Sequence, residues 1–189
     1  LCLLVPSLKE SLGGFANQYL NINTELKGNL QRLELPYFQV SWLSGSRLDA
    51  KGVLYNITDT NKLAFDIYIL QSNFLKKDFI KFVPKENLAS LEKLPAVFNL
   101  TGHFVGDKNN IVADLKTNAK DFAFSGKVNL KNISNPARLN YDVLVSELSL
   151  DKNMITGFMP PEALENIELP QKISAAGKLT GNTNNITTD

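Results

Sequence analysis

Cysteine and histidine are almost absent from this sequence: its 189 residues include one of each, Cys2 and His103. Single residues of these kinds cannot build a disulfide framework or a Cys/His metal cluster, and they disfavour histidine-based catalysis. The 19 acidic residues leave open a carboxylate pair of the glycosidase type. The acids that recur along the chain, however, fall on predicted wet faces or at strand ends. We therefore expect no enzyme, no metal and no cofactor.

Arginine is scarce and no basic block is present. Twenty basic residues face 19 acidic ones, for a formal net charge of +1, whereas nucleic-acid binding requires clustered cations. The longest apolar run, Leu1–Val5, is far shorter than the ~20 residues that span a bilayer, and no basic segment precedes it. We expect no nucleic-acid partner, and we expect any membrane anchor or export signal to lie outside this chain.

The most informative pattern is an internal repeat. Residues 94–114 align without a gap on residues 169–189, at a constant offset of 75 positions. The aligned segments share a Leu-Pro pair, two glycines, an Asn-Asn-Ile motif and a final aspartate. Nearly the same offset relates four earlier pairs, namely Gly52 to Gly126, Ile57 to Ile133, Leu63 to Leu139 and Asp66 to Asp142. A fixed period of this kind indicates a repeat architecture.

The repeat divides the chain into three parts. We expect a partial N-terminal repeat at residues 1–45, a central repeat at residues 46–119 and a second repeat at residues 120–189 that continues beyond this fragment. The N-terminal copy rests on a weak match of residues 27–30 to residues 101–104. The alternative is a duplication inside one ordinary β-sandwich.

Apolar and polar residues alternate in most of the segments between turns. The alternation covers residues 20–26, 63–69, 122–130 and 139–145, and a period of two is typical of a sheet with one apolar and one wet face. Short polar turn signals separate the segments, at residues 44–46, 58–61, 107–110, 132–136 and 181–185. This spacing predicts antiparallel meanders.

Two short helices are predicted between the strands. The first is expected to start at Ser72 or Asn73 and to end before Pro84, and the second to end before Pro160. Each carries an apolar stripe at helical spacing, formed by Leu75, Phe79, Phe82 and Val83 in the first and by Met154, Ile155, Phe158 and Met159 in the second. Helices of three turns at most either cross the open side of a sheet as lids or plug the end of a sandwich.

A sheet with one apolar face must place that face against something. Roughly a dozen strands at ~4.8 Å spacing would make a sheet about 55 to 60 Å wide, and open sheets beyond ~10 strands curl or fold over. The apolar face then lines the inside of the fold. The two halves of the apolar face either meet in a dry core or stay apart and form a trough for an apolar ligand. The periodicity does not distinguish between these two possibilities.

Several motifs follow one another in a fixed order. They are Leu94-Pro95, the segment from Leu100 to Gly106, the segment from Ile111 to Thr117, Phe124-Ser-Gly126-Lys-Val128, and in the second copy Leu169-Pro170 and the segment from Gly177 to Gly181. In this combination, over roughly residues 40–189, the chain resembles the repeating part of the AsmA-like/TamB family, in particular the TamB form of Bacteroidetes.

The resemblance implies a mainly β fold, in which an elongated, curled antiparallel sheet of the β-taco kind encloses an apolar groove and carries two short helices. It implies a periplasmic part of a Gram-negative envelope protein, anchored in the inner membrane through a segment outside this chain. It also implies a role in moving phospholipid between the two membranes, or in outer-membrane assembly with a TamA-type barrel.

The candidate lipid-binding residues are the apolar side chains that share one parity along the predicted strands. They are Phe65, Ile67, Ile69, Phe98, Leu100, Phe104, Phe122, Phe124, Val128, Tyr141, Val143, Val145, Ile173 and Leu179. The expected ligand is phospholipid or another acyl-chain compound, and the competing interpretation of these residues is an ordinary core. His103 falls on the polar parity and is interpreted as solvated, while Cys2 is given no role.

Two other functions stay open. A structural β-sandwich or solenoid, as the binding module of a surface adhesin or a glycan-binding protein, would have a dry core and exposed aromatic platforms, for which Tyr37, Trp42 and Tyr55 are available. Templating of barrel strands would depend on unpaired strand edges. The recurring glycines are interpreted as sites of a bulge or a sharp curl, and they are Gly102, Gly106, Gly126, Gly177 and Gly181.

Overall fold

The computed structural model describes residues 20–42, 44–79, 95–158 and 168–188, which form ten strands and two short α-helices. The strands are β1 (Leu20–Gly28), β2 (Arg32–Trp42), β3 (Arg47–Tyr55), β4 (Ala64–Leu75), β5 (Val97–Asp107), β6 (Asn110–Ala119), β7 (Phe122–Lys131), β8 (Asn140–Asp151), β9 (Lys172–Asn182) and β10 (Ile186–Thr188). The helices are α2 (Lys76–Phe79) and α4 (Lys152–Phe158), and the 3-10 turn η4 spans Pro136–Arg138.

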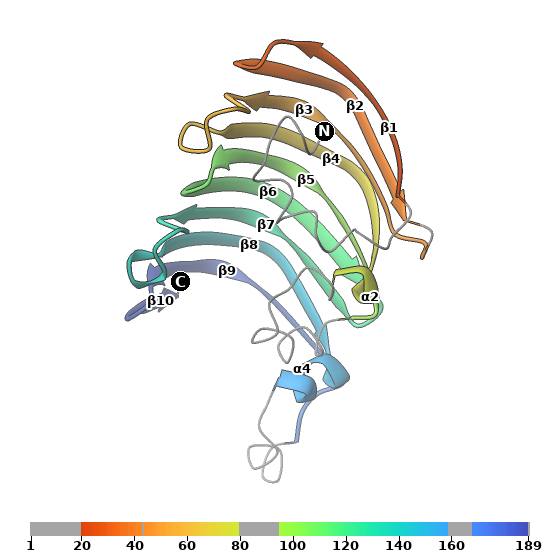
Figure 1. Ribbon diagram of the computed structural model, residues 1–189. Helices are drawn as coiled ribbons and strands as arrows, with labels where there is room; N and C mark the ends of the chain where they lie inside the picture. The colour runs from red at the N-terminus through yellow and green to blue at the C-terminus, as the bar shows by residue number, and fades with distance from the viewer. Residues whose placement is uncertain (1–19, 43, 80–94, 159–167, 189) are drawn as a thin grey trace.

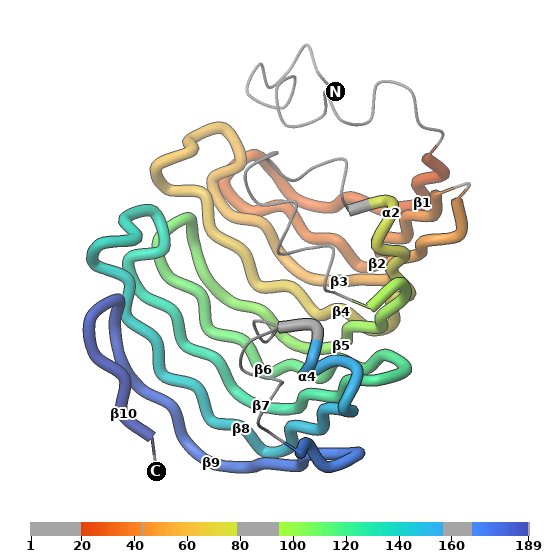
Figure 2. The backbone as a smooth tube through the Cα atoms, turned by 90° about the horizontal axis from the view of Figure 1, so that it is seen from below, coloured from red at the N-terminus to blue at the C-terminus, as the bar shows by residue number. Residues whose placement is uncertain are grey.

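All ten strands belong to one sheet, in which each strand pairs antiparallel with its neighbours in sequence, from β1 to β10. The long strands bend along their length, so that the stacked strands form a trough (Figure 1). Figure 2 shows the same stack from below, with β1 and β10 at its opposite ends. The predicted fold class, an elongated and curled antiparallel sheet with two short helices, is confirmed. The described residues form ten strands, where roughly a dozen were expected for the chain.

The three predicted parts of the chain lie in this one continuous sheet. Residues 1–45 contribute β1 and β2, residues 46–119 contribute β3 to β6, and residues 120–189 contribute β7 to β10. Each of the five turn signals falls in a hairpin connection between consecutive strands. Because the described strands all belong to one open sheet, they do not form the two facing sheets of a sandwich.

The repeat recurs in the hydrogen bonds of the turns. In the β5–β6 turn, Asp107 Oδ1 accepts the backbone N–H groups two and three positions later, at 2.6 and 2.9 Å. Asn182 does the same in the β9–β10 turn, at 2.8 and 3.0 Å. Asn29 does so in the β1–β2 turn, at 2.9 and 3.0 Å. The same turn geometry therefore recurs every four strands. The weakly matched N-terminal copy of the repeat has it as well.

The alternate turns repeat as well. Asn56 and Asn132 both adopt a positive φ, of 53° and 61°, and each side-chain amide donates to the carbonyl six residues later at 3.1 Å. The strand register corrects one sequence match, that of Gly52 with Gly126. Gly126 lies opposite Val145, and the residue 76 positions before Val145 is Ile69. Ile69 lies opposite Ala50, not Gly52, so Ala50 is the structural equivalent of Gly126.

Glycine is required inside β5. Gly102 has a φ of 155°, and a Cβ atom at this position would lie 2.5 Å from the carbonyl oxygen of Asp114 on β6. Because no side chain can occupy that space, residue 102 must be glycine for β5 and β6 to pair as they do. The interpretation that this glycine permits a sharp local backbone conformation agrees with the geometry.

The first helix differs from its prediction. Ser72, Asn73 and Leu75 belong to β4 rather than to a helix, and α2 begins at Lys76. The cause is pairing with neighbouring strands, since residues 72–75 lie opposite β3 or β5 and continue the sheet. The second helix, α4, includes Met154, Ile155 and Phe158 as predicted. Both helices follow the equivalent strands, β4 and β8, at the same edge of the sheet (Figure 1).

Some predicted features lie outside the described residues. They are Cys2, Phe82, Val83, Pro84, Leu94, Met159 and Pro160.

Candidate functional site

The fourteen predicted lining residues lie on one face of the sheet. The pairing shows this directly, since residues opposite each other on neighbouring strands point to the same side. One such row runs from β4 to β9 through Ile67, Phe104, Ala113, Val128, Val143 and Leu179. The other nine predicted residues share the parity of this row. They are Phe65, Ile69, Phe98, Leu100, Phe122, Phe124, Tyr141, Val145 and Ile173.

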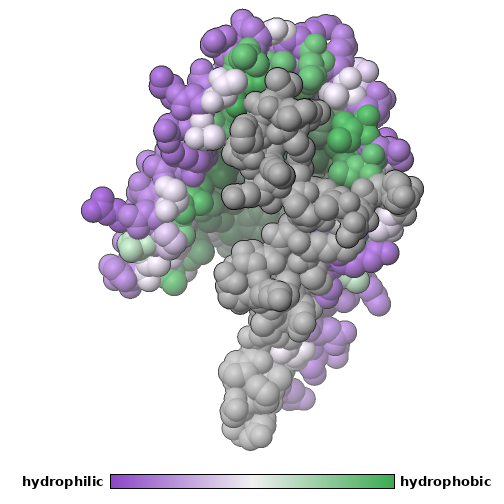
Figure 3. Space-filling view, viewed as in Figure 1, coloured by the Kyte–Doolittle hydropathy of each residue, from purple (hydrophilic) through white to green (hydrophobic). Residues whose placement is uncertain are grey.

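Strand by strand, the predicted lining consists of Phe65, Ile67 and Ile69 on β4, Phe98, Leu100 and Phe104 on β5, Phe122, Phe124 and Val128 on β7, Tyr141, Val143 and Val145 on β8, and Ile173 and Leu179 on β9. Hydrophobic side chains gather in the hollow of the curved sheet, and hydrophilic ones surround its edges (Figure 3). We call the face toward the hollow the inner face and the opposite one the outer face.

The inner face also includes apolar residues that the sequence reasoning missed. On β2 and β3 they are Leu35, Phe38, Val40, Leu48, Ala50 and Leu54, on β6 Ile111, Ala113 and Leu115, and on β8 Leu148 and Leu150. Register shifts hid several of them, because a bulge moves the apolar set to the other parity. One shift lies between Leu35 and Phe38 on β2, and another lies between Val145 and Leu148 on β8.

Small and large side chains alternate along the middle of the inner face. The row of directly opposed residues runs from β3 to β9 through Ala50, Ile69, Gly102, Leu115, Gly126, Val145 and Gly177. We call it the midline row. Every odd-numbered strand contributes alanine or glycine, and every even-numbered strand contributes a branched aliphatic residue. The rows beside it include Phe104 and Phe124, and the Phe124 ring lies close to Gly126, where a Cβ atom would be 3.1 Å from Phe124 Cζ.

The paired residues on the inner face of β2 to β9 carry no charge. A register shift between Ile69 and Phe74 leaves Leu100 of β5 without a backbone partner on β4. Ser72 supplies both contacts: its hydroxyl donates to the Leu100 carbonyl at 2.6 Å and accepts the Leu100 N–H at 2.7 Å. The polar requirement of this buried serine is thereby met, and the inner face stays apolar.

The outer face carries the charged and hydrogen-bonding side chains. His103 lies on this face, as its parity predicts, but it has partners: Nε2 is 2.7 Å from Asp66 Oδ1, and its ring stacks on Tyr68 with centroids 3.9 Å apart. Lys51 Nζ lies 5.8 Å from the centre of the Tyr68 ring. Lys127 Nζ lies 3.9 Å from Asp114 on the neighbouring strand. This face therefore meets water, and His103 is a member of a cluster.

The aromatic residues considered for a binding platform do not share a face. Trp42 is opposite Leu20 on the inner parity, whereas Tyr37 and Tyr55 are on the outer parity. Tyr37 lies opposite Glu25, and Tyr55 lies opposite Arg32 and Ala64. These three side chains therefore do not form one aromatic surface.

A buried polar corner fixes α2 to the turn between β2 and β3. Asp78 is 2% exposed, and its Oδ2 accepts hydrogen bonds from the hydroxyls of Ser44 and Ser46, each at 2.5 Å. Ser46 Oγ in turn accepts the N–H of Leu75 at 2.9 Å. Within the described part of the chain, Asp78 Oδ1 and Trp42 Nε1 are buried without a hydrogen-bond partner. The first helix is thus anchored by a carboxylate.

The turns at the other edge contain one clearly shifted acid. The N–H groups of Asn109 and Asn110 hold the pKa of Asp107 below its ordinary value, because they stabilise the ionised carboxylate. The Asp107 carboxylate therefore stabilises the β5–β6 turn by accepting these two hydrogen bonds.

The described residues contain no group of three or more His, Cys, Asp or Glu that could hold a metal ion. No described helix has the length and hydropathy needed to cross a membrane. Comparison of the chain with protein-family models, with curated proteins and with solved structures found no match.

Proposed function

We propose that the inner face binds the acyl chains of lipids and that the chain is a lipid-transfer or assembly module of the bacterial envelope. The observation that carries this proposal is the continuous apolar inner face, which runs uncharged from β2 to β9 in an open sheet. The described strands all lie in a single layer, so no second sheet of described strands covers this face. An extended apolar face without a second sheet of described strands over it is suited to binding an apolar ligand.

The energetics favour a carrier of acyl chains. Each CH₂ group exposed to water costs ~0.8 kcal/mol, and an apolar trough removes much of that cost. Ten strands at ~4.8 Å spacing extend over about 43 Å, whereas one leaflet of a bilayer core is roughly 15 Å thick. The inner face is thus long enough for more than one acyl chain in a line.

The inner face also suits movement rather than tight binding. Apolar contacts are not directional, and rows such as the one through Phe104 and Val128 repeat from strand to strand. Similar contacts at each strand give no single strongly preferred position. Chains can then slide along the trough, and no catalytic residue is required.

The resemblance to the AsmA-like/TamB family supports the same proposal. On this basis we propose that the chain lies in the periplasm of a Gram-negative bacterium, as part of a protein anchored in the inner membrane. Phospholipid is the proposed ligand, and a TamA-type outer-membrane barrel is the proposed partner. The motifs that carry this part of the proposal include Leu100 to Gly106 on β5 and Phe124 to Val128 on β7.

The experiment that tests the function combines lipid analysis with photo-crosslinking. Protein purified without detergent is extracted with organic solvent, and the extract is analysed by mass spectrometry. A photo-crosslinking residue is placed at Phe124 on the inner face and, as the matched control on the same strand, at Lys127 on the outer face. We expect phospholipid in the extract and a lipid adduct at position 124 only. Absence of lipid, or equal adducts at the two positions, would contradict the proposal.

A further inference from the structure

Uncharged amide side chains are concentrated on one part of the outer face. We call this part the amide patch and define it as Asn21, Asn23, Gln39, Gln71, Asn73, Asn99 and Asn118. The strand pairing places these residues in two neighbouring rows, at the end of the strands nearer to α2. Asparagine is depleted in strands because its side chain competes for backbone hydrogen bonds. Five asparagines on one face of a sheet therefore call for a reason.

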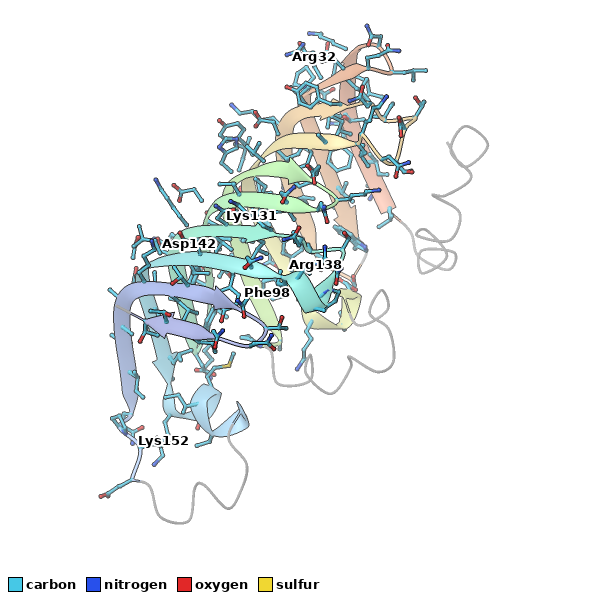
Figure 4. All side chains as sticks on the ribbon, turned by 90° about the vertical axis from the view of Figure 1, so that its left-hand side faces the viewer. Arg32, Phe98, Lys131, Arg138, Asp142 and Lys152 are labelled. Atoms are coloured by element: carbon cyan, nitrogen blue, oxygen red, sulfur yellow. The ribbon has the colours of Figure 1, made fainter. Side chains whose placement is uncertain are left out.

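The next two rows toward the hairpin turns differ in composition. On β3 to β6 their outer-face residues are Lys51, Val53, Asp66, Tyr68, His103, Val105, Val112 and Asp114, and none of these eight is an amide. Figure 4 shows charged residues of the outer face near the hairpin turns, namely Arg32 on β2, Lys131 on β7 and Asp142 on β8. The amide patch is thus a distinct part of the outer face.

The amide patch includes a hollow over β1 to β3. The hollow has a volume of about 250 Å³ and is lined by Asn21, Ile22, Asn23, Gln39, Val40, Ser41, Arg47 and Asp49. Its two charges neutralise each other, since Arg47 donates to both carboxylate oxygens of Asp49, at 3.1 and 2.8 Å. Asn23 Nδ2 donates to Gln39 Oε1 at 3.3 Å, and both amides keep further donors and acceptors. The hollow therefore offers hydrogen-bonding groups without net charge.

An aromatic ring lies beside this hollow. Tyr37 precedes Gln39 by two residues on the outer face of β2, and it is 40% exposed. Among the described residues, no ring stacks on Tyr37, whereas the ring of Tyr68 is stacked on His103. Glu25, opposite Tyr37, is paired with Lys27 at 3.0 Å. An accessible aromatic ring and a set of uncharged polar groups are thus neighbours on this face.

We propose that the amide patch binds a neutral oligosaccharide, with a sugar ring against Tyr37 and its hydroxyl groups in the hollow. A sugar hydroxyl donates and accepts hydrogen bonds at once, and side-chain amides supply both kinds of partner. The C–H groups of a sugar ring form an apolar surface that packs on an aromatic ring. A charged ligand would lose hydration here without gaining an unpaired counter-charge, because Arg47 and Asp49 already neutralise each other.

This site lies on the face opposite the proposed lipid site and does not depend on it. Calorimetric titration of the whole chain with cellotetraose, chitotetraose and maltotetraose provides the test, and tetragalacturonate is the charged comparison. The first test variant is N23A/Q39A, and its matched control is N129A/N140A on the outer face of β7 and β8. Each of these double variants removes two amides and one side-chain hydrogen bond.

The second test variant is Y37A. Its control is Y68A, which removes a tyrosine of nearly equal exposure, 42%, from the same face. Circular dichroism checks the folding of every variant, and exposed substitutions of this kind change stability little.

We expect at least one neutral tetrasaccharide to bind with a Kd on the order of 1 mM, and tetragalacturonate to bind more weakly. Affinity should fall at least about fivefold in N23A/Q39A, as expected for the loss of two hydrogen bonds. It should also fall in Y37A, and the controls should keep the wild-type affinity. Added salt should change the affinity little, since the bound groups are uncharged.

Three results would overturn the proposal: no binding of any neutral tetrasaccharide, tighter binding of tetragalacturonate, or equal weakening in test and control variants. Dimerisation of the wild type that is abolished in N23A/Q39A, measured by size-exclusion chromatography, would also overturn it. In that case a second copy of the chain covers the amide patch.

Discussion

Asp107 and Asn182 hold equivalent positions in two turns 75 residues apart, one as a carboxylate and the other as an amide. The Oδ1 atom of each accepts backbone N–H groups two and three positions later. The two turns therefore have the same geometry, but only the one at Asp107 can titrate. This difference predicts that the stabilisation from the Asp107 turn depends on pH, and that an aspartate introduced at position 182 would give the β9–β10 turn the same dependence.

The stabilisation from Asp107 should be lost in acid. The folded-state pKa is lowered from the ordinary value of 3.8, so the contribution is present above that pH and disappears as the pH falls through the lowered folded value. Thermal unfolding at pH 7 and pH 3 should show a smaller acid loss in Asp107→Asn than in the wild type. Asn182→Asp should show a larger acid loss. Identical pH profiles for all three proteins would contradict this account.

Substitution of Gly102 should destabilise the sheet. In Gly102→Ala the new Cβ would meet the Asp114 carbonyl oxygen on β6, and the backbone φ of 155° is unfavourable for alanine. We expect a loss of about 1–3 kcal/mol in the free energy of unfolding, measured by urea denaturation. Val105→Ala, at a 39% exposed site on the same strand, is the control, and its loss should be about 0.5 kcal/mol or less. Equal losses would argue against the close approach at position 102.

Removal of the carboxylate that anchors α2 should also destabilise the fold. Asp78→Ala leaves the hydroxyls of Ser44 and Ser46 without their shared acceptor. We expect a loss of about 1–3 kcal/mol, measured by chemical denaturation. Asp78→Asn keeps an oxygen acceptor and should lose less. A larger loss in the asparagine variant than in the alanine variant would mean that the hydroxyl contacts do not stabilise the corner.

A large side chain on the midline row should obstruct the trough. Leu115 lies between Gly102 and Gly126 in that row, so an indole at this position would project farther from the inner face than the native side chain does. In Leu115→Trp we expect less than about half of the wild-type lipid per protein, determined by mass spectrometry of extracts, with folding checked by circular dichroism. Val112→Trp on the outer face of β6, where the native side chain is 53% exposed, is the control. Reduced lipid in both variants would argue against a role of the midline row.

The alternation of apolar residues was enough to predict the strands and their inner face. Phe122, Phe124 and Val128 share a face with Tyr141, Val143 and Val145 because strict alternation survives across the β7–β8 hairpin. Prediction failed where a bulge changes the parity, so that Leu148 and Leu150 on β8 were missed. A bulge depends on the match between two strands, and one strand read by itself does not show it.

The end of β4 shows the same limit. Ser72 and Leu75 have a spacing that a short amphipathic helix would also have, but they extend β4 because β3 and β5 supply their partners. Ser72 is buried where its hydroxyl completes the hydrogen bonds of Leu100. His103 likewise gained Asp66 and Tyr68 as neighbours only through pairing of β4 with β5.

Local order in the sequence thus determined the strands, the turns, the four-strand repeat and the parity of the apolar residues, since each depends on neighbours along the chain. The tertiary structure alone decided the bulges, the length of β4 and the alternation of small and large residues along the midline row. These features arise from contacts between strands, and the register of those strands is set by the whole curved sheet.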